Sequence, residues 1–189
     1  IGDLAHAPLP FVQKIVGMKL GKQLHDYANG SDNSPVLAEP EAAKGYSIST
    51  TLEEDVVKVD QAHRVLLALT DSVTARMRAD GFKAYCIAVS IRSNDFKTRS
   101  HQRKLYDPTD ISSEAYSLCK QLFAELWDGH TPLRLIGVAL TDLTKEEPAQ
   151  ISLFPDEKKE RSRKLDQAYD AIHKKFGATA IQRGSNLQS

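Results

Sequence analysis

Basic and hydroxyl-bearing side chains gather in one short stretch of the chain, between residues 83 and 104. Six Lys or Arg residues stand there against a single acid, Asp95. Within this stretch, residues 98–104 offer no apolar side to a sheet, because both alternating sets are polar. Cationic and hydroxyl groups at this density suit hydrogen bonds to phosphate oxygens. A charged edge strand that blocks pairing with other sheets explains the segment equally well when it is considered alone.

Residues that could make or break bonds are not arranged for that chemistry. Glu53, Glu54 and Asp55 adjoin a strand end and a helix start, where they complement the helix dipole. The six histidines are scattered, and no GxSxG, Walker A or CxxC motif occurs. The sequence therefore predicts a binding protein with no catalytic residue, metal site or cofactor of its own.

The overall composition fits a globular domain. The 189 residues carry 25 basic and 25 acidic side chains, and 41% of them are hydrophobic. No apolar run approaches the roughly 20 residues that span a bilayer, so no membrane partner is expected. Cys86 and Cys119 lie in apolar segments, which favours reduced core thiols and a cytoplasmic protein. The opening at Ile1, without an initiator Met or a leader, suggests a piece of a longer protein.

Hydrophobic periodicity outlines an α+β fold. Alternating residues predict strands over 46–52, 84–91, 98–106 and 133–140. Apolar residues three and four apart predict one helix carrying residues 62–77, stopped by Gly81, and another capped by Ser112 or Ser113. The order βαββαβ predicts a four-stranded sheet with two helices on one face.

Turn-forming residues and polar stretches divide the chain. We expect a small helical unit over 1–30, a linker over 31–45 and the sheet domain over 46–143. The remainder, 144–189, holds an isolated apolar patch and then a basic amphipathic helix marked by Leu165, Ala168, Tyr169, Ile172 and Phe176.

The sheet is predicted to have one face of small residues. Ala84, Cys86, Ala88 and Ser90 alternate with Tyr85, Ile87, Val89 and Ile91, and Gly137, Ala139 and Thr141 alternate with larger neighbours. The large residues are expected to face the helices. A flat ligand could then approach the small face closely, which favours the phosphate-binding interpretation of 98–104.

Five motifs in order resemble a known family. They are Gly17 to Asp32 with its two spaced glycines, Ser47–Leu52, Asp95–Ser100, Asp128-Gly129 followed by Leu133–Val138, and Gln150–Phe154. In this order they resemble the C-terminal half of a bacterial Y-family translesion DNA polymerase of the DNA polymerase IV type. The resemblance implies a thumb remnant, a little-finger DNA-binding domain and a sliding-clamp-binding peptide. The spacing of Gly17 and Gly21 is one residue longer than the family's hairpin.

The resemblance implies that the protein grips duplex primer–template DNA by its backbone, without sequence specificity. The implied DNA-binding residues are Gly17, Gly21, Thr50, Thr51, Arg92, Lys97, Thr98, Arg99, Ser100, His101 and Arg103. The implied β sliding-clamp contacts are Gln150, Ile151, Ser152, Leu153 and Phe154. Polymerase chemistry and its Mg²⁺ ions would belong to a palm domain upstream of Ile1, so this chain alone is expected to be inactive.

Two other function classes fit parts of the pattern. An RNA-binding RRM has the same βαββαβ order, but it needs aromatic residues on the outer face of its central strands, where this sequence has Ala, Cys, Ser and Gly. A protein-interaction domain would use Gln150–Phe154 and would bind no nucleic acid.

Overall fold

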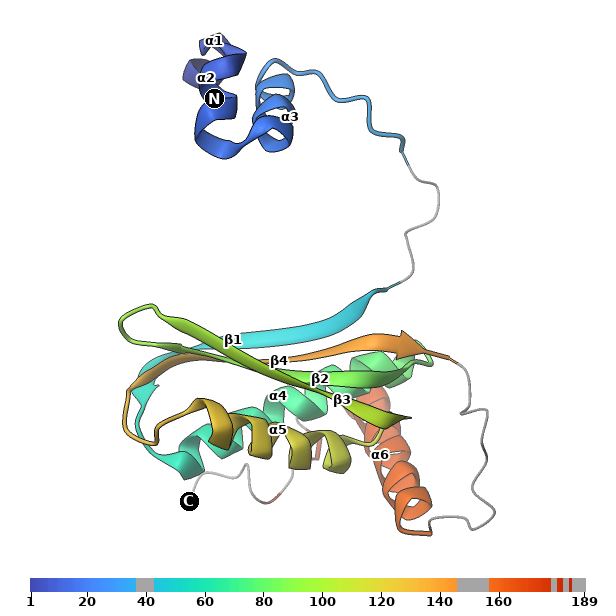
Figure 1. Cartoon of the computed structure of the whole chain (residues 1–189). Helices are drawn as coiled ribbons and strands as arrows, with labels where there is room; N and C mark the ends of the chain where they lie inside the picture. Colours follow the sequence, from blue (N-terminus) through green and yellow to red (C-terminus); the bar gives the residue numbers. More distant parts are fainter. Residues whose placement is uncertain (37–42, 146–156, 178–179, 182–183, 185–189) are drawn as a thin grey trace. The chain divides into compact units, whose positions relative to one another are not determined.

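The chain divides into two compact units, residues 1–42 and 43–189. The computed structural model describes residues 1–36, 43–145, 157–177, 180–181 and 184. Figure 1 shows a helical first unit and a second unit built on a sheet. The clamp-binding peptide predicted over 150–154 lies outside the described residues.

The first unit consists of three short helices: α1 (Gly2–His6), α2 (Leu9–Val16) and α3 (Met18–Ala28). Gly17 alone joins α2 to α3, at a φ of +92° that favours glycine. The two spaced glycines therefore do not bracket one hairpin, because Gly17 is the single residue between the helices and Gly21 lies inside α3. A Cβ on Gly21 would stand 2.7 Å from the Cα of Gln13. Gly21 is needed for close packing of α3 on α2.

The second unit has the predicted βαββαβ order. Its elements are β1 (Gly45–Val56), α4 (Val59–Ala79), β2 (Lys83–Ser93), β3 (Thr98–Thr109), α5 (Ser112–Leu126) and β4 (Leu133–Thr144). The strands form one antiparallel sheet in the order β1-β4-β2-β3, which leaves β1 and β3 at the edges. Both α4 and α5 cover the same side of the sheet (Figure 1). The α+β prediction is confirmed.

The core lies between the sheet and the two helices. Leu66, Val73 and Met77 on α4 are fully buried, as the helical spacing predicts. They meet the large residues of the central strands, such as Ile87 and Val138. Cys86 and Cys119 are buried free thiols, and burial raises the pKa of Cys119 to about 11.

The alternation of β2 fails at its first residues. Ala84 is fully buried in the core, although the sequence predicts it on the small face. The pairing of β2 with β3 shifts between Ala84 and Cys86, because Ala84 pairs with Thr109 and Cys86 pairs with Lys104. Tyr85 is only half-buried, and the Lys104 ammonium lies 5.8 Å from its ring centroid. An irregular register therefore exchanges the faces of the first two residues.

A sixth helix of the chain, α6 (Glu157–Phe176), packs on the sheet unit through polar groups. Arg78 of α4 donates to both carboxylate oxygens of Asp170, at 2.7 and 3.0 Å. Asp166 is 3% exposed and accepts a hydrogen bond from the backbone N–H of Ser112 at 2.8 Å. Arg78 also donates to the Ser112 hydroxyl at 2.9 Å. This polar network holds the helix on the domain.

The apolar residues predicted to form the buried face of α6 are not the residues that this helix buries. Leu165 is 62% exposed and Phe176 is 65% exposed, whereas Asp166 is buried. The predicted cap of α5 is also wrong, because no side chain of Ser112 or Ser113 bonds the helix start. Asp166 of α6 performs that role from a distant part of the sequence.

Candidate nucleic-acid interface

The face of the sheet opposite α4 and α5, called the outer face below, is lined by small and hydroxyl-bearing side chains. The cross-strand register assigns to it Ser47, Ser49 and Thr51 of β1, Leu135, Gly137, Ala139 and Thr141 of β4, Cys86, Ala88, Ser90 and Arg92 of β2, and Thr98, Ser100, Gln102 and Lys104 of β3. In Figure 1, the helices of this unit lie on the other side of the sheet.

A shallow groove of about 430 Å³ runs across the middle of this face. Its floor depends on Gly137, since a Cβ there would stand 2.6 Å from the Ser90 Oγ and 3.1 Å from the Ser49 Cβ. Larger side chains on these strands would fill the groove. The sheet therefore offers backbone and hydroxyl groups to a flat or rod-like ligand at close range.

The turn between β2 and β3 adds positive charge at one end of the outer face. Arg92 donates from Nε to the Thr98 hydroxyl at 2.9 Å, which holds both side chains across the two strands. Lys97 lies 2.8 Å from Asp95 and stays largely exposed. Hydrogen bonds from Lys97 and Ser93 lower the pKa of Asp95 to about 2.

Lys104 marks the other end of β3 on the outer face. Its ammonium lies 2.6 Å from the Asp142 carboxylate, which raises the pKa of Lys104. Exposed ion pairs of this kind contribute little to stability, because solvent screens them, so a phosphate can compete for the lysine.

The predicted basic residues of β3 do not all share this surface. Arg99, His101 and Arg103 pair across the strands with core residues of β2, so they project on the helix side. His101 lies 3.0 Å from Glu125 of α5, and Arg103 lies 2.6 Å from the same carboxylate. Arg99, nearer the turn, is exposed, and its guanidinium has no hydrogen bond or ion pair to another described residue.

The two threonines predicted on β1 also separate. Thr51 is exposed on the outer face, whereas Thr50 pairs with Ile136 on the helix side and is half-buried. A single phosphate cannot reach both hydroxyls from one face of the sheet.

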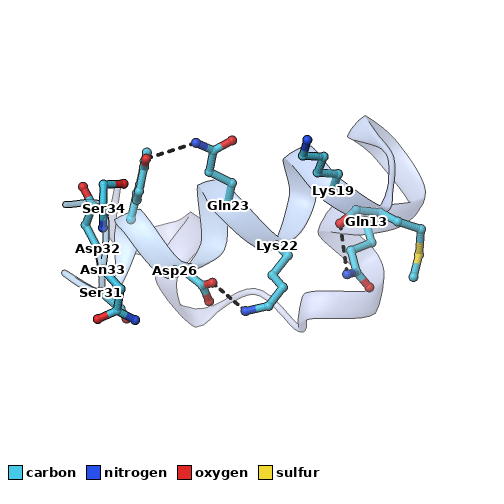
Figure 2. A pocket seen from close by; sticks show the side chains of 11 residues that line it. Gln13, Lys19, Lys22, Gln23, Asp26, Ser31, Asp32, Asn33 and Ser34 are labelled. Atoms are coloured by element: carbon cyan, nitrogen blue, oxygen red, sulfur yellow. Dashed lines mark hydrogen bonds and ion pairs between the residues drawn. The ribbon is translucent and has the colours of Figure 1, made fainter. Parts of the chain in front are cut away.

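The helical unit has its own polar hollow, of about 700 Å³. Figure 2 shows the lysines of α3 along it, with Lys22 lying 2.7 Å from Asp26. Gly17 stands at the start of α3 with no heavy atom within 4 Å of where a Cβ would be. Gly21 does not share this exposure: it is buried against Gln13, so its backbone is closed to a phosphate.

The described part of the chain lacks two other kinds of feature. None of its helices is long and apolar enough to cross a membrane. Among the same residues, no group of three or more His, Cys, Asp or Glu side chains is placed to hold a metal ion.

The fold is similar to part of a solved structure. A Y-family DNA polymerase chimera matches with a TM-score of 0.51 and 20% identity, over 76% of this chain and 41% of that one. Residues 43–153 match the model of the impB/mucB/samB family C-terminal domain. The chain belongs to this family.

Curated relatives extend the similarity beyond that domain. DNA polymerase IV of Clostridium acetobutylicum is 33% identical over 89% of this chain and 42% of its own length. DNA polymerase IV 2 of Bacillus subtilis is 35% identical over 99% of this chain and 46% of its length. The chain therefore spans somewhat less than half the length of these relatives. The predicted resemblance to the C-terminal part of a DNA polymerase IV is confirmed.

Proposed function

We propose that this chain is the DNA-binding part of a translesion DNA polymerase and that it holds duplex primer–template DNA by the sugar–phosphate backbone. The observation that carries the proposal is the bare outer face, with its groove floored by Gly137 and its cationic turn between β2 and β3. The family membership supports it.

The contacts follow from where the side chains lie. Arg92 and Lys97 are placed to reach phosphate oxygens at the turn. Arg99 projects on the helix side of the edge strand, near the same turn, and its exposed guanidinium is proposed to reach a phosphate at the edge of the sheet. Hydroxyls of the outer face supply uncharged hydrogen bonds; these are Thr51, Thr98 and Ser100. His101 and Arg103 support the edge strand through Glu125 and are left out of the proposed contacts.

A second contact is proposed for the helical unit. The backbone N–H groups that follow Gly17 at the start of α3 are open to a phosphate, and Lys19 stands in the first turn. This contact retains Gly17 from the sequence prediction but drops Gly21.

Backbone contacts suit the proposed role in DNA repair. Phosphate contacts fix the position of a duplex without reading its bases, so a damaged template is held as well as an intact one. Nucleotidyl transfer needs carboxylates that hold two metal ions. We assign that chemistry, and its Mg²⁺, to the part of the relatives that the match does not cover.

The segment Gln150–Phe154 is proposed to bind a β sliding clamp in the cytoplasm. Leu153 and Phe154 would enter an apolar pocket, and Gln150 would fix the register. Replacing Leu153 and Phe154 by Ala should abolish capture by immobilised clamp while leaving the affinity for duplex DNA unchanged. Loss of both activities would show that the two side chains are needed by the domain itself.

Fluorescence anisotropy with the full chain tests the DNA-binding proposal. A labelled primer–template should bind at low salt, and an unlabelled duplex should compete better than single-stranded RNA of equal length. Preferential competition by the RNA would support an RRM-like module. No binding of either nucleic acid at low salt would leave a protein-interaction domain.

A further inference from the structure

The turn between β2 and β3 holds an aromatic ring in solvent. Phe96 has a φ of +63°, in the left-handed region that bulky residues rarely adopt, and it is 66% exposed. Its N–H donates to the Ser93 carbonyl at 3.0 Å, and the Ser93 N–H donates to the Lys97 carbonyl at 3.1 Å. Asn94 donates to the Pro132 carbonyl, which joins the turn to the chain before β4. The ring is therefore presented by a fixed backbone.

A guanidinium lies over this ring. The Cζ of Arg134 is 5.3 Å from the Phe96 centroid, within the range of a cation–π contact. Arg134 is the extra residue of a β-bulge, because Arg92 and Ser93 of β2 pair with Leu135 and Leu133 of β4. Bulges redirect side chains, and this one places the arginine beside the turn. Its guanidinium makes no hydrogen bond or ion pair to another described residue.

We propose that Phe96 and Arg134 form a stacking site for an unpaired nucleobase of the template strand. The inference rests on the proposed function and extends it from the duplex backbone to a single-stranded overhang. Aromatic rings and arginines are the side chains on which unpaired bases stack, without regard to sequence. Arg92 and Lys97 belong to the same turn, and we propose that they hold the phosphates on either side of such a base.

An unpaired base is the ligand that this chemistry fits. Inside a duplex both faces of a base are covered by its neighbours, and a phosphate gains little from an aromatic ring. The turn lies at one end of the sheet (Figure 1), so a nucleotide beyond the duplex held on the outer face can reach the ring.

Tyr106 provides a matched control. It lies in β3, the strand that follows the turn, and it is 90% exposed. No cation lies over its ring among the described residues, and it stands toward the other end of the strand from the turn. Tyr106→Ala removes an exposed ring from the strand that follows the turn and leaves the proposed site unchanged.

The test compares a blunt duplex with the same duplex carrying a 5′ overhang that contains 2-aminopurine. In the full chain, Phe96→Ala should weaken overhang binding by about tenfold, from the usual strength of base–aromatic stacking, and should remove the quenching of 2-aminopurine. Blunt-duplex affinity should change less than twofold by comparison. Phe96→Tyr should restore the quenching, and Tyr106→Ala should change neither signal.

A second variant separates stacking from folding. Phe96→Gly removes the ring but suits the positive φ, so the turn keeps its backbone. The same loss in Phe96→Gly supports the inference. Quenching that persists in both variants, or an equal loss on blunt and overhang DNA, would overturn it while leaving the proposed duplex contact intact. If the wild-type chain bound neither the blunt duplex nor the overhang duplex, the proposed function would be contradicted, and the inference that rests on it would fail as well.

Discussion

The carboxylate of Asp166 accepts a hydrogen bond from the backbone N–H of Ser112 at 2.8 Å, across 54 residues of sequence. Ser112 is the first residue of α5, whose early N–H groups have no partner within the helix. The start of α5 is thus capped by α6. The same carboxylate lies 3.6 Å from Arg78, so one buried acid joins three helices.

Asp166→Ala should destabilise the sheet unit by about 1–3 kcal/mol, because the Ser112 N–H and the Arg78 guanidinium lose a buried acceptor. Asp166→Asn keeps an acceptor oxygen for the N–H and should cost less. Urea unfolding of the two variants measures the difference. Equal stabilities for Ala and Asn would show that the hydrogen bond to Ser112 contributes nothing.

Gly137→Ala should destabilise the sheet unit by about 1 kcal/mol, since its Cβ would stand 2.6 Å from the Ser90 Oγ. The double variant Gly137→Ala with Ser90→Gly removes that clash and should recover at least part of the loss. Thermal unfolding of the single and double variants measures this coupling. A double variant that is less stable than Gly137→Ala alone would contradict the crowded floor of the groove.

Arg99 and Arg103 should differ in their effect on DNA binding, although they belong to the same strand. Arg99→Ala removes an unpaired exposed guanidinium and should reduce the slope of log affinity against log salt by about 0.9, the value for one phosphate contact. Arg103→Ala breaks an ion pair with Glu125 and should leave the slope nearly unchanged. Anisotropy titrations at several salt concentrations make the comparison; a larger effect of Arg103 would reverse the assignment.

The turn that presents Phe96 should weaken in acid. Hydrogen bonds from Lys97 and Ser93 lower the pKa of Asp95 from 3.8 to about 2. A lowered folded-state pKa stabilises the native state above the unfolded pKa, and this stabilisation is lost as the pH falls from about 4 through about 2. Asp95→Asn has no carboxylate to titrate, so it is expected to melt at a lower temperature than the wild type at pH 5. The wild type alone loses the stabilisation in acid, so the difference between the two melting temperatures should shrink as the pH falls. A deficit that stays constant from pH 5 to pH 2 would contradict this role of Asp95.

Periodicity in the sequence predicts the elements of the sheet unit well. The spacing of Ala62, Leu66, Leu69, Val73 and Met77 identifies the buried face of α4, and all five are buried. Gly81 has a φ of +74° just after that helix, as expected for its stop signal. These patterns are local, since each residue's face is fixed by its own helix or strand.

What the sequence does not reveal depends on residues far apart in the chain. The packing of α6 rests on Arg78 with Asp166 and Asp170, and no periodic pattern marks a buried acid as an anchor. The exchanged face of Ala84 comes from an irregular register with β3, and a strict alternation cannot anticipate it. The burial of Gly21 follows from its contact with Gln13, whereas its sequence context suggests a phosphate hairpin.

The separation of the basic residues on β3 has the same origin. Alternation places Arg99 and Arg103 on one side of the strand, but only the position of Glu125 on α5 shows that Arg103 is already paired. The Phe96–Arg134 pair also escapes sequence analysis, because a bulge in β4 brings the arginine to the turn. A large aromatic in a turn with adjacent basic residues is the signal that could have drawn attention to it.

The most direct test of the central claim is a salt titration of the full chain with two duplexes of unrelated sequence. If the outer face grips the sugar–phosphate backbone, both duplexes should bind with equal affinity, and log affinity should fall linearly with log salt at a slope of several units. A strong preference for one duplex, or an affinity that does not depend on salt, would contradict the account.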